Sequence, residues 1–181
     1  MATYFSDHFS GVNEDTLEPD NSVLDLTKFP EPGSHRSRLR YKRAEITRDF
    51  GSSDVLRMMQ FKSGDRINAI FVTATDSGST GQFGIGLYET GRDHDGTQID
   101  ENLFRSAMVT TTAINHVDQF MNPGHPDSDL LRGKPLWVVA DAGDGDYSVD
   151  PMEDWDLCLV CSAATEVSTQ VIIEVYFTSG D

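Results

Sequence analysis

Gln82-Phe83-Gly84-Ile85-Gly86-Leu87-Tyr88 alternates strictly between large apolar residues and small or polar ones. Successive side chains of a β-strand point to opposite faces, so Phe83, Ile85 and Leu87 are expected on one face and the two glycines on the other. Glycine inside a strand often marks a place where another backbone or a bulky ring approaches closely. The stretch therefore predicts a strand with one buried face and one closely covered face.

Similar patterns recur along the chain, with short Gly- and Ser-containing turns between them. They predict eight strands and a single short helix, Asp100–Arg105, which has acids in its first turn. Eight strands that do not alternate with helices indicate an all-β, two-sheet sandwich; a jelly-roll topology is favoured, with an immunoglobulin-like sandwich as the alternative. The predicted strands are Leu39–Asp49, Asp54–Phe61, Ile67–Ala74, Gln82–Tyr88, Ser106–Asn115, Pro135–Asp141, Asp156–Ser162 and Val171–Phe177.

Residues 1–35 show no sustained hydrophobic period and contain seven acids and one base. Pro30, Pro32 and Gly33 favour an extended hinge before residue 36. We therefore predict an extended acidic N-terminal arm, residues 1–35, followed by one sandwich domain, residues 36–181. The arm has more apolar side chains than an inert linker needs, so we expect it to order against a neighbour. Its aromatic anchors are Tyr4, Phe5, Phe9 and Phe29.

The net charge of −16 comes from 14 Lys and Arg against 30 Asp and Glu. A surface this acidic repels nucleic acid and anionic membranes, so we expect neither to be a partner. No stretch is apolar enough to span a bilayer, and the first residues lack the pattern of a secretory signal. These features predict a soluble protein made in a cytoplasm. The charge could also do no more than solvate the surface.

Basic residues are concentrated just after the arm. Arg36, Arg38, Arg40 and Lys42 recur at every second position, which places all four on one face of a strand. Two interpretations stay open. The strand face could bind an acidic surface, namely the arm, a neighbouring subunit or a separate partner. Alternatively, the charges could protect an edge strand from aggregation. In the first interpretation the four bases and the aromatic anchors of the arm form one partner interface.

No catalytic or cofactor-binding motif is present, and the five histidines fall in predicted arm or loop segments. Cys158 and Cys161 lie at an odd offset on an apolar strand, so their thiols should point to opposite faces as small core residues, without a disulfide or a zinc site. Seven acids between Asp141 and Asp156 could surround calcium, but their spacing is not that of an EF-hand loop. A solvated acidic loop is favoured. We therefore predict no catalytic residue, no cofactor and no metal.

The order of several segments resembles the small virion proteins of tailed bacteriophages, in particular the head decoration (cement) proteins built on a jelly roll. The resemblance covers roughly residues 39–115. Its segments are Asp54–Phe61, Gly64–Ile67, Thr75–Gly81, Phe83–Gly91 and Ile99–Phe104. It implies a non-enzymatic protein on the outer surface of a phage head, made in the host cytoplasm. It also implies a homo-trimer at local three-fold positions that clamps neighbouring subunits of the major capsid protein.

A carbohydrate- or receptor-binding β-sandwich of a virion is the alternative function. It would require exposed aromatic side chains near the acidic run, for which Trp137, Tyr147 and Trp155 are the candidates. Trp137 falls in a predicted apolar strand and is expected in the core. A metal-dependent enzyme of cupin type is disfavoured, because it needs histidines clustered on adjacent strands.

Overall fold

A computed structural model describes residues 3–5, 39–120, 131–142 and 146–180 of the chain. Within these ranges the elements are nine strands and one short helix, α2 (Leu136–Ala142). The strands are β1 (Thr3–Phe5), β2 (Leu39–Arg48), β3 (Val55–Lys62), β4 (Arg66–Ala74), β5 (Gln82–Glu89), β6 (Gln98–Val109), β7 (Ile114–Asp118), β8 (Asp154–Ala163) and β9 (Thr169–Thr178).

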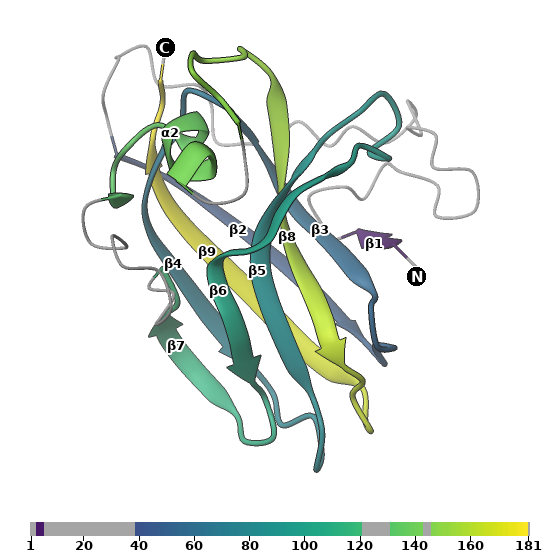
Figure 1. Ribbon diagram of the computed structural model, residues 1–181. Coiled ribbons are helices and arrows are strands. Elements are labelled where there is room, and N and C mark those ends of the chain that lie inside the picture. Colours follow the sequence, from purple (N-terminus) through teal and green to yellow (C-terminus); the bar gives the residue numbers. More distant parts are fainter. Residues whose placement is uncertain (1–2, 6–38, 121–130, 143–145, 181) are drawn as a thin grey trace, which may run out of the picture.

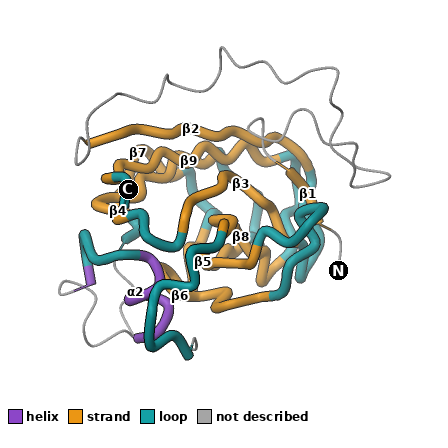
Figure 2. The backbone as a smooth tube through the Cα atoms, turned by 90° about the horizontal axis from the view of Figure 1, so that it is seen from above, coloured by secondary structure: helices purple, strands orange, loops and turns teal. Residues whose placement is uncertain are grey.

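The strands form two sheets that pack face to face (Figures 1 and 2). One has the order β1-β3-β8-β5-β6 and the other the order β2-β9-β4-β7. Neighbouring strands are antiparallel, except that β1 runs parallel to β3. The predicted all-β, two-sheet sandwich is confirmed.

The pairing of the strands is nested along the chain. β2 pairs with β9, β3 with β8, β4 with β7, and β5 with β6. Such nesting results when one long hairpin is rolled into two sheets, which is how a jelly roll is built. An immunoglobulin-like sandwich instead starts with two consecutive strands side by side in one sheet. The strand order therefore agrees with the topology favoured from the sequence.

The inner faces of the two sheets form the main hydrophobic core. Phe83, Ile85 and Leu87 of β5 have no exposed area and point into this core, as predicted. Trp155 of β8 is also fully buried there. Cys158 and Cys161 are both buried and free, and they belong to different apolar clusters on opposite faces of β8, as their spacing predicts.

The outward face of β5 is covered by a bulge of β6. Ile85 pairs with Arg105 and Leu87 with Asp100, so the four residues between Asp100 and Arg105 face a single residue of β5. A Cβ atom on Gly86 would lie 2.1 Å from the carbonyl oxygen of Asp100, which explains why glycine is needed there. The predicted helix at Asp100–Arg105 is therefore wrong: these residues are strand, and the bulge lets both Leu103 and Phe104 reach the core.

The segment Pro135–Asp141 is a second correction, because it was predicted as a strand and forms α2. The backbone amides of Val138 and Val139 donate to the carbonyl oxygen of Pro135, whose fixed φ suits the first turn of a helix. The apolar run that suggested a strand instead buries one side of the helix, at Leu136, Val139 and Ala140. The predicted strand Ser106–Asn115 is also interrupted, since β6 ends at Val109 and β7 begins at Ile114.

The sequence analysis did not identify a strand within the predicted extended arm, and the structure has one at Thr3–Phe5. These residues form β1, with Thr3 opposite Val55 and Phe5 opposite Arg57. Three residues are too few to show a hydrophobic period, so the sequence pattern could not reveal the strand. Residues 6–35 of the predicted arm lie outside the described residues.

Candidate interaction surfaces

The basic segment identified from the sequence lies at an edge. β2 is the outermost strand of its sheet, and Arg40 and Lys42 alternate along it with the exposed Leu39, Tyr41 and Arg43. Arg40 and Lys42 thus share one strand face, as predicted, and both are half-buried. That face is directed toward the opposite sheet. Arg36, Arg38, Phe9 and Phe29 lie outside the described residues, and Tyr4 and Phe5 belong to β1.

Lys42 connects the two sheets at this edge. Its ammonium lies 4.5 Å from the ring centroid of Phe61 on β3 and 5.2 Å from that of Phe177 on β9, and it donates to the carbonyl oxygen of Gln60. Burial lowers the pKa of Lys42, although Asp65 and Asp154 act in the opposite direction. An inward-pointing charge on an edge strand hinders pairing with another chain, so Lys42 has a place in the fold that is separate from any partner.

A row of aromatic rings crosses the outer face of the same sheet, one ring from each strand. Tyr41 of β2 packs on Tyr176 of β9, with ring centroids 5.3 Å apart. Tyr176 meets Phe71 of β4 edge to face at 5.9 Å. Phe71 stacks on the ring of His116 of β7, with centroids 4.4 Å apart and planes at 4°. We call these four residues the aromatic row.

Glu174 of β9 holds the two ends of the aromatic row together. Its Oε1 accepts a hydrogen bond from the Tyr41 hydroxyl, and its Oε2 lies 2.9 Å from Nδ1 of His116. Partial burial, followed by the hydrogen bond to Glu174, raises the pKa of Tyr41 to about 12. The row is therefore a preorganised surface of rings with one carboxylate at its centre.

His116 adopts an unusual backbone conformation in this row, with φ of 50°. Non-glycine residues rarely occupy this region, and such outliers are concentrated at functional sites. The prediction that all histidines lie in arm or loop segments is wrong for His116, which is part of β7. One signal of the row was present in the sequence: Tyr176 lies on the strand face opposite to the apolar Val175 and Phe177.

The other sheet buries an ion pair on its outer face. Nη1 of Arg57 lies 2.6 Å from Oδ2 of Asp156, and both side chains are almost completely buried. Thr90 Oγ1 donates to Asp156 Oδ1 at 2.9 Å, and His94 Nδ1 lies 3.2 Å from Asp156 Oδ2. Asp156 was expected in a solvated acidic run, and this is wrong. The ion pair instead fixes the connection between β5 and β6 onto the sheet.

The remaining acids of the run Asp141–Asp156 are used in separate places. Asp141 accepts a hydrogen bond from the backbone amide of Tyr147, and Asp150 accepts one from that of Met152. Asp144 lies outside the described residues. Within the described ranges, no three histidine, cysteine or acidic side chains come together in a way that could hold a metal ion.

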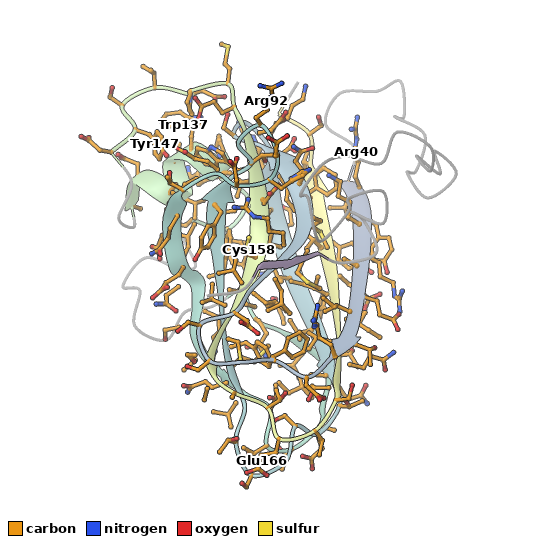
Figure 3. The ribbon with its side chains drawn as sticks, turned by 90° about the vertical axis from the view of Figure 1, so that its right-hand side faces the viewer. Arg40, Arg92, Trp137, Tyr147, Cys158 and Glu166 are labelled. Atoms are coloured by element: carbon orange, nitrogen blue, oxygen red, sulfur yellow. The ribbon has the colours of Figure 1, made fainter. Side chains whose placement is uncertain are left out.

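A polar hollow of ≈ 590 Å³ lies at one end of the sandwich. Glu89, Glu153 and Asp154 line it together with Arg92 and His94. Figure 3 shows Arg92, Trp137 and Tyr147 at this end, and Glu166 at the opposite one. Three carboxylates and one arginine suit contact with basic groups.

The aromatic residues expected to form a sugar platform do not form one. Trp155 has no exposed area, and Tyr147 packs against it at 5.2 Å between ring centroids. Trp137 was predicted in a strand, but it lies on α2, where it is half-buried against the core. None of these three side chains is exposed beside the acidic run.

No family model matches the chain, and no curated protein matches its sequence. Its fold matches a chain of a solved structure described as "Capsid of Ralstonia phage GP4". The TM-score is 0.63 at 12% identity, and the alignment covers 99% of both chains. A chain from "Cyanophage Pam1 capsid asymmetric unit" aligns with a TM-score of 0.44 at 10% identity over 83% of this chain and 92% of that one. Among the described residues, no helix is long and apolar enough to cross a membrane.

Proposed function

We propose that this chain is a non-enzymatic virion structural protein that decorates a phage head. It binds across neighbouring subunits of the major capsid protein on the outer surface and stabilises the head as a homo-trimer. The observation that carries this proposal is the fold shared over 99% of both chains with a chain of the Ralstonia phage GP4 capsid. The sequence resemblance to decoration proteins over residues 39–115 points in the same direction.

The outer face of the β2-β9-β4-β7 sheet is the surface best suited to contact the capsid. Its aromatic row and the neighbouring Arg43 are of the residue types that dominate binding energy in protein interfaces. Tyr41 is 38% exposed, and Leu39, on the same face of β2, is 63% exposed. On the other sheet, Val55, Arg57 and Cys158 on the outer face are all buried, which leaves less apolar area for a partner.

The N-terminal segment is the second part of the proposed interface. Tyr4, Phe5, Phe9 and Phe29 supply apolar anchors, and Arg36 and Arg38 precede β2 directly. Arg40 and Lys42 continue the basic segment along the edge of the sheet that carries the aromatic row. Because Arg40 and Lys42 face the opposite sheet, the charged contribution to this interface comes from Arg36 and Arg38 before β2, next to the edge of the sheet that carries the aromatic row.

Co-sedimentation with purified, undecorated heads tests this function. We expect the protein to sediment with heads in a saturable manner and to raise the temperature at which heads release DNA. Tyr41→Ser should weaken binding about tenfold or more, since an interface aromatic typically contributes about 2 kcal/mol. Thr47→Ser, an exposed change on the same face of the same strand, is the matched control and should bind normally. Protein that stays in the supernatant at every concentration would refute the proposal.

A further inference from the structure

The edge of β3 accepts a short strand, β1, that is far from the rest of the domain in the sequence. β1 covers only Val55–Arg57 of β3, which continues to Lys62, and the pairing is parallel. Between Phe5 at the end of β1 and Leu39 at the start of β2 the chain has 33 residues. The paired strands β1 and β3 are joined by residues 6–54, which include β2 in the other sheet, whereas a parallel pair needs a crossover of only about a dozen residues.

The length of this connection sets the distance over which β1 can act. A chain of 33 residues spans at most about 110 Å. A second copy held within that reach therefore offers its β3 edge to the same β1.

The face beside β1 has hydrogen-bonding groups without a partner among the described residues. Val55, Tyr88, Cys158 and Val160 form a buried apolar cluster on the outer side of the sheet, and the guanidinium of Arg57 lies 5.5 Å from the Tyr88 ring. Arg57 Nε and the Tyr88 hydroxyl are buried without a hydrogen-bond partner among the described residues. Buried polar groups are rarely unpaired, so we expect further chain beside β1 to cover this face, whichever copy supplies β1.

We propose that, in the assembled state, β1 of one copy pairs with β3 of a neighbouring copy. This inference rests on the proposed function, because a head holds neighbouring copies at a fixed, short spacing. The contacts between β1 and β3 are the same whichever chain supplies the strand, so exchange costs little contact energy. The geometry of the assembly then decides which β3 edge each β1 occupies. Exchanged strands would link the decoration proteins to one another across the head.

Mixed cysteine variants test the exchange. One variant carries Thr3→Cys and an affinity tag, and the other carries Val55→Cys without a tag, because these positions face each other in the register. Both carry Cys158→Ala, since Cys158 shares the cluster of Val55. The two proteins are mixed, bound to heads and oxidised. We expect a tagged–untagged disulfide dimer on heads, at several-fold the yield found in dilute solution. Thr3→Cys mixed with Thr47→Cys, on the exposed side of β2, is the control and should give none.

A second measurement covers the case in which Val55→Cys destabilises the buried cluster. Energy transfer is followed from a donor on Thr3→Cys of one copy to an acceptor on the exposed Ser52→Cys of another. Transfer between copies on heads supports exchange. If heads bind the protein but crosslinks and transfer arise only within one chain, the exchange is wrong and the proposed function stands. If heads do not bind the protein, the proposed function fails. The exchange is then tested with the same mixtures at millimolar concentration without heads. Crosslinks between copies would support it, and crosslinks within one chain alone would overturn it.

Discussion

Arg57 of β3 and Asp156 of β8 form an ion pair of 2.6 Å on the outer face of the sheet, where their side chains are only 4% and 0% exposed. Arg57 also donates to the carbonyl oxygens of Glu89 at 2.9 Å and Gly96 at 2.8 Å. These two carbonyls lie at the start and near the end of the connection between β5 and β6. One buried arginine therefore joins a long connection to the middle of a sheet.

Breaking this ion pair should strongly destabilise the fold. Asp156→Ala leaves the Arg57 charge buried without its partner, which typically costs about 3–5 kcal/mol in free energy of unfolding. The double change Arg57→Met with Asp156→Leu should cost less than Asp156→Ala alone, because both charges are then removed together. Denaturant titration of Asp156→Ala, of Arg57→Met and of the double variant measures this. Equal or additive losses in the double variant would contradict a coupled pair.

Gly86 should not tolerate even one added methyl group. In Gly86→Ala the new Cβ would meet the carbonyl of Asp100 at 2.1 Å, so β6 must move away from β5. We expect a loss of about 1–3 kcal/mol in free energy of unfolding, as for other overpacked sites. Gly51→Ala is the matched control, because its nearest neighbour is an oxygen of the Asp54 side chain at 3.2 Å. Thermal melts of both variants test this difference in stability. Equal melting temperatures would contradict the close approach of β6 to Gly86.

Strands with a clear period of two could be predicted from the sequence, and β5 shows why. Phe83, Ile85 and Leu87 alternate with glycines, and only one register puts these side chains into a core. The bulge at residues 101–104 could not be predicted, because its acids and paired apolar residues also match the first turn of a helix. Residues 101–104 form a bulge and not a helix because the bulge fits into the space above Gly84 and Gly86. That space exists only once β5 and β6 have paired.

The stability of the protein should fall between about pH 10 and 12. Burial, the largest cause, raises the pKa of Tyr88 to about 12 from an ordinary value of 10. The folded state then holds the phenolic proton more tightly than the unfolded state, so this stabilisation is complete below pH 10 and is lost as the pH rises through 12. For Tyr88 the loss is on the order of 2–3 kcal/mol.

Tyr88→Phe separates this effect from general alkaline unfolding. The variant lacks the titrating hydroxyl, so its melting temperature should fall less steeply over the same pH range. It should also be at least as stable as the parent at pH 7, since the hydroxyl is buried without a partner among the described residues. Melting curves from pH 7 to 12 measure both. Parallel curves for the two proteins would contradict the assignment to Tyr88.

Deleting residues 1–35 should leave the two-sheet core folded, because the main core is built by β2 to β9. The deletion removes β1, so we expect a modest fall in melting temperature and an exposed β3 edge, which favours association between chains. Light scattering and thermal melts of the shortened chain check both effects. A chain that no longer folds would show that the N-terminal segment belongs to the domain.

The surfaces were harder to predict than the strands because they join residues from distant parts of the chain. Tyr41, Phe71, His116 and Tyr176 come from four strands, and only the order β2-β9-β4-β7 brings their rings into one row. The basic period at Arg40 and Lys42 was visible in the sequence. The sequence did not show that these two side chains point inward, because alternation predicts which residues share a face but does not predict which face turns toward the core.

The most direct test of the proposed function is electron cryomicroscopy of undecorated heads incubated with the purified protein. We predict trimeric density at local three-fold positions on the outer surface, with each copy contacting at least two capsid subunits through the β2-β9-β4-β7 sheet. The aromatic row should lie within that contact. Heads that show no added density at saturating protein, or density that touches only one subunit, would contradict the account.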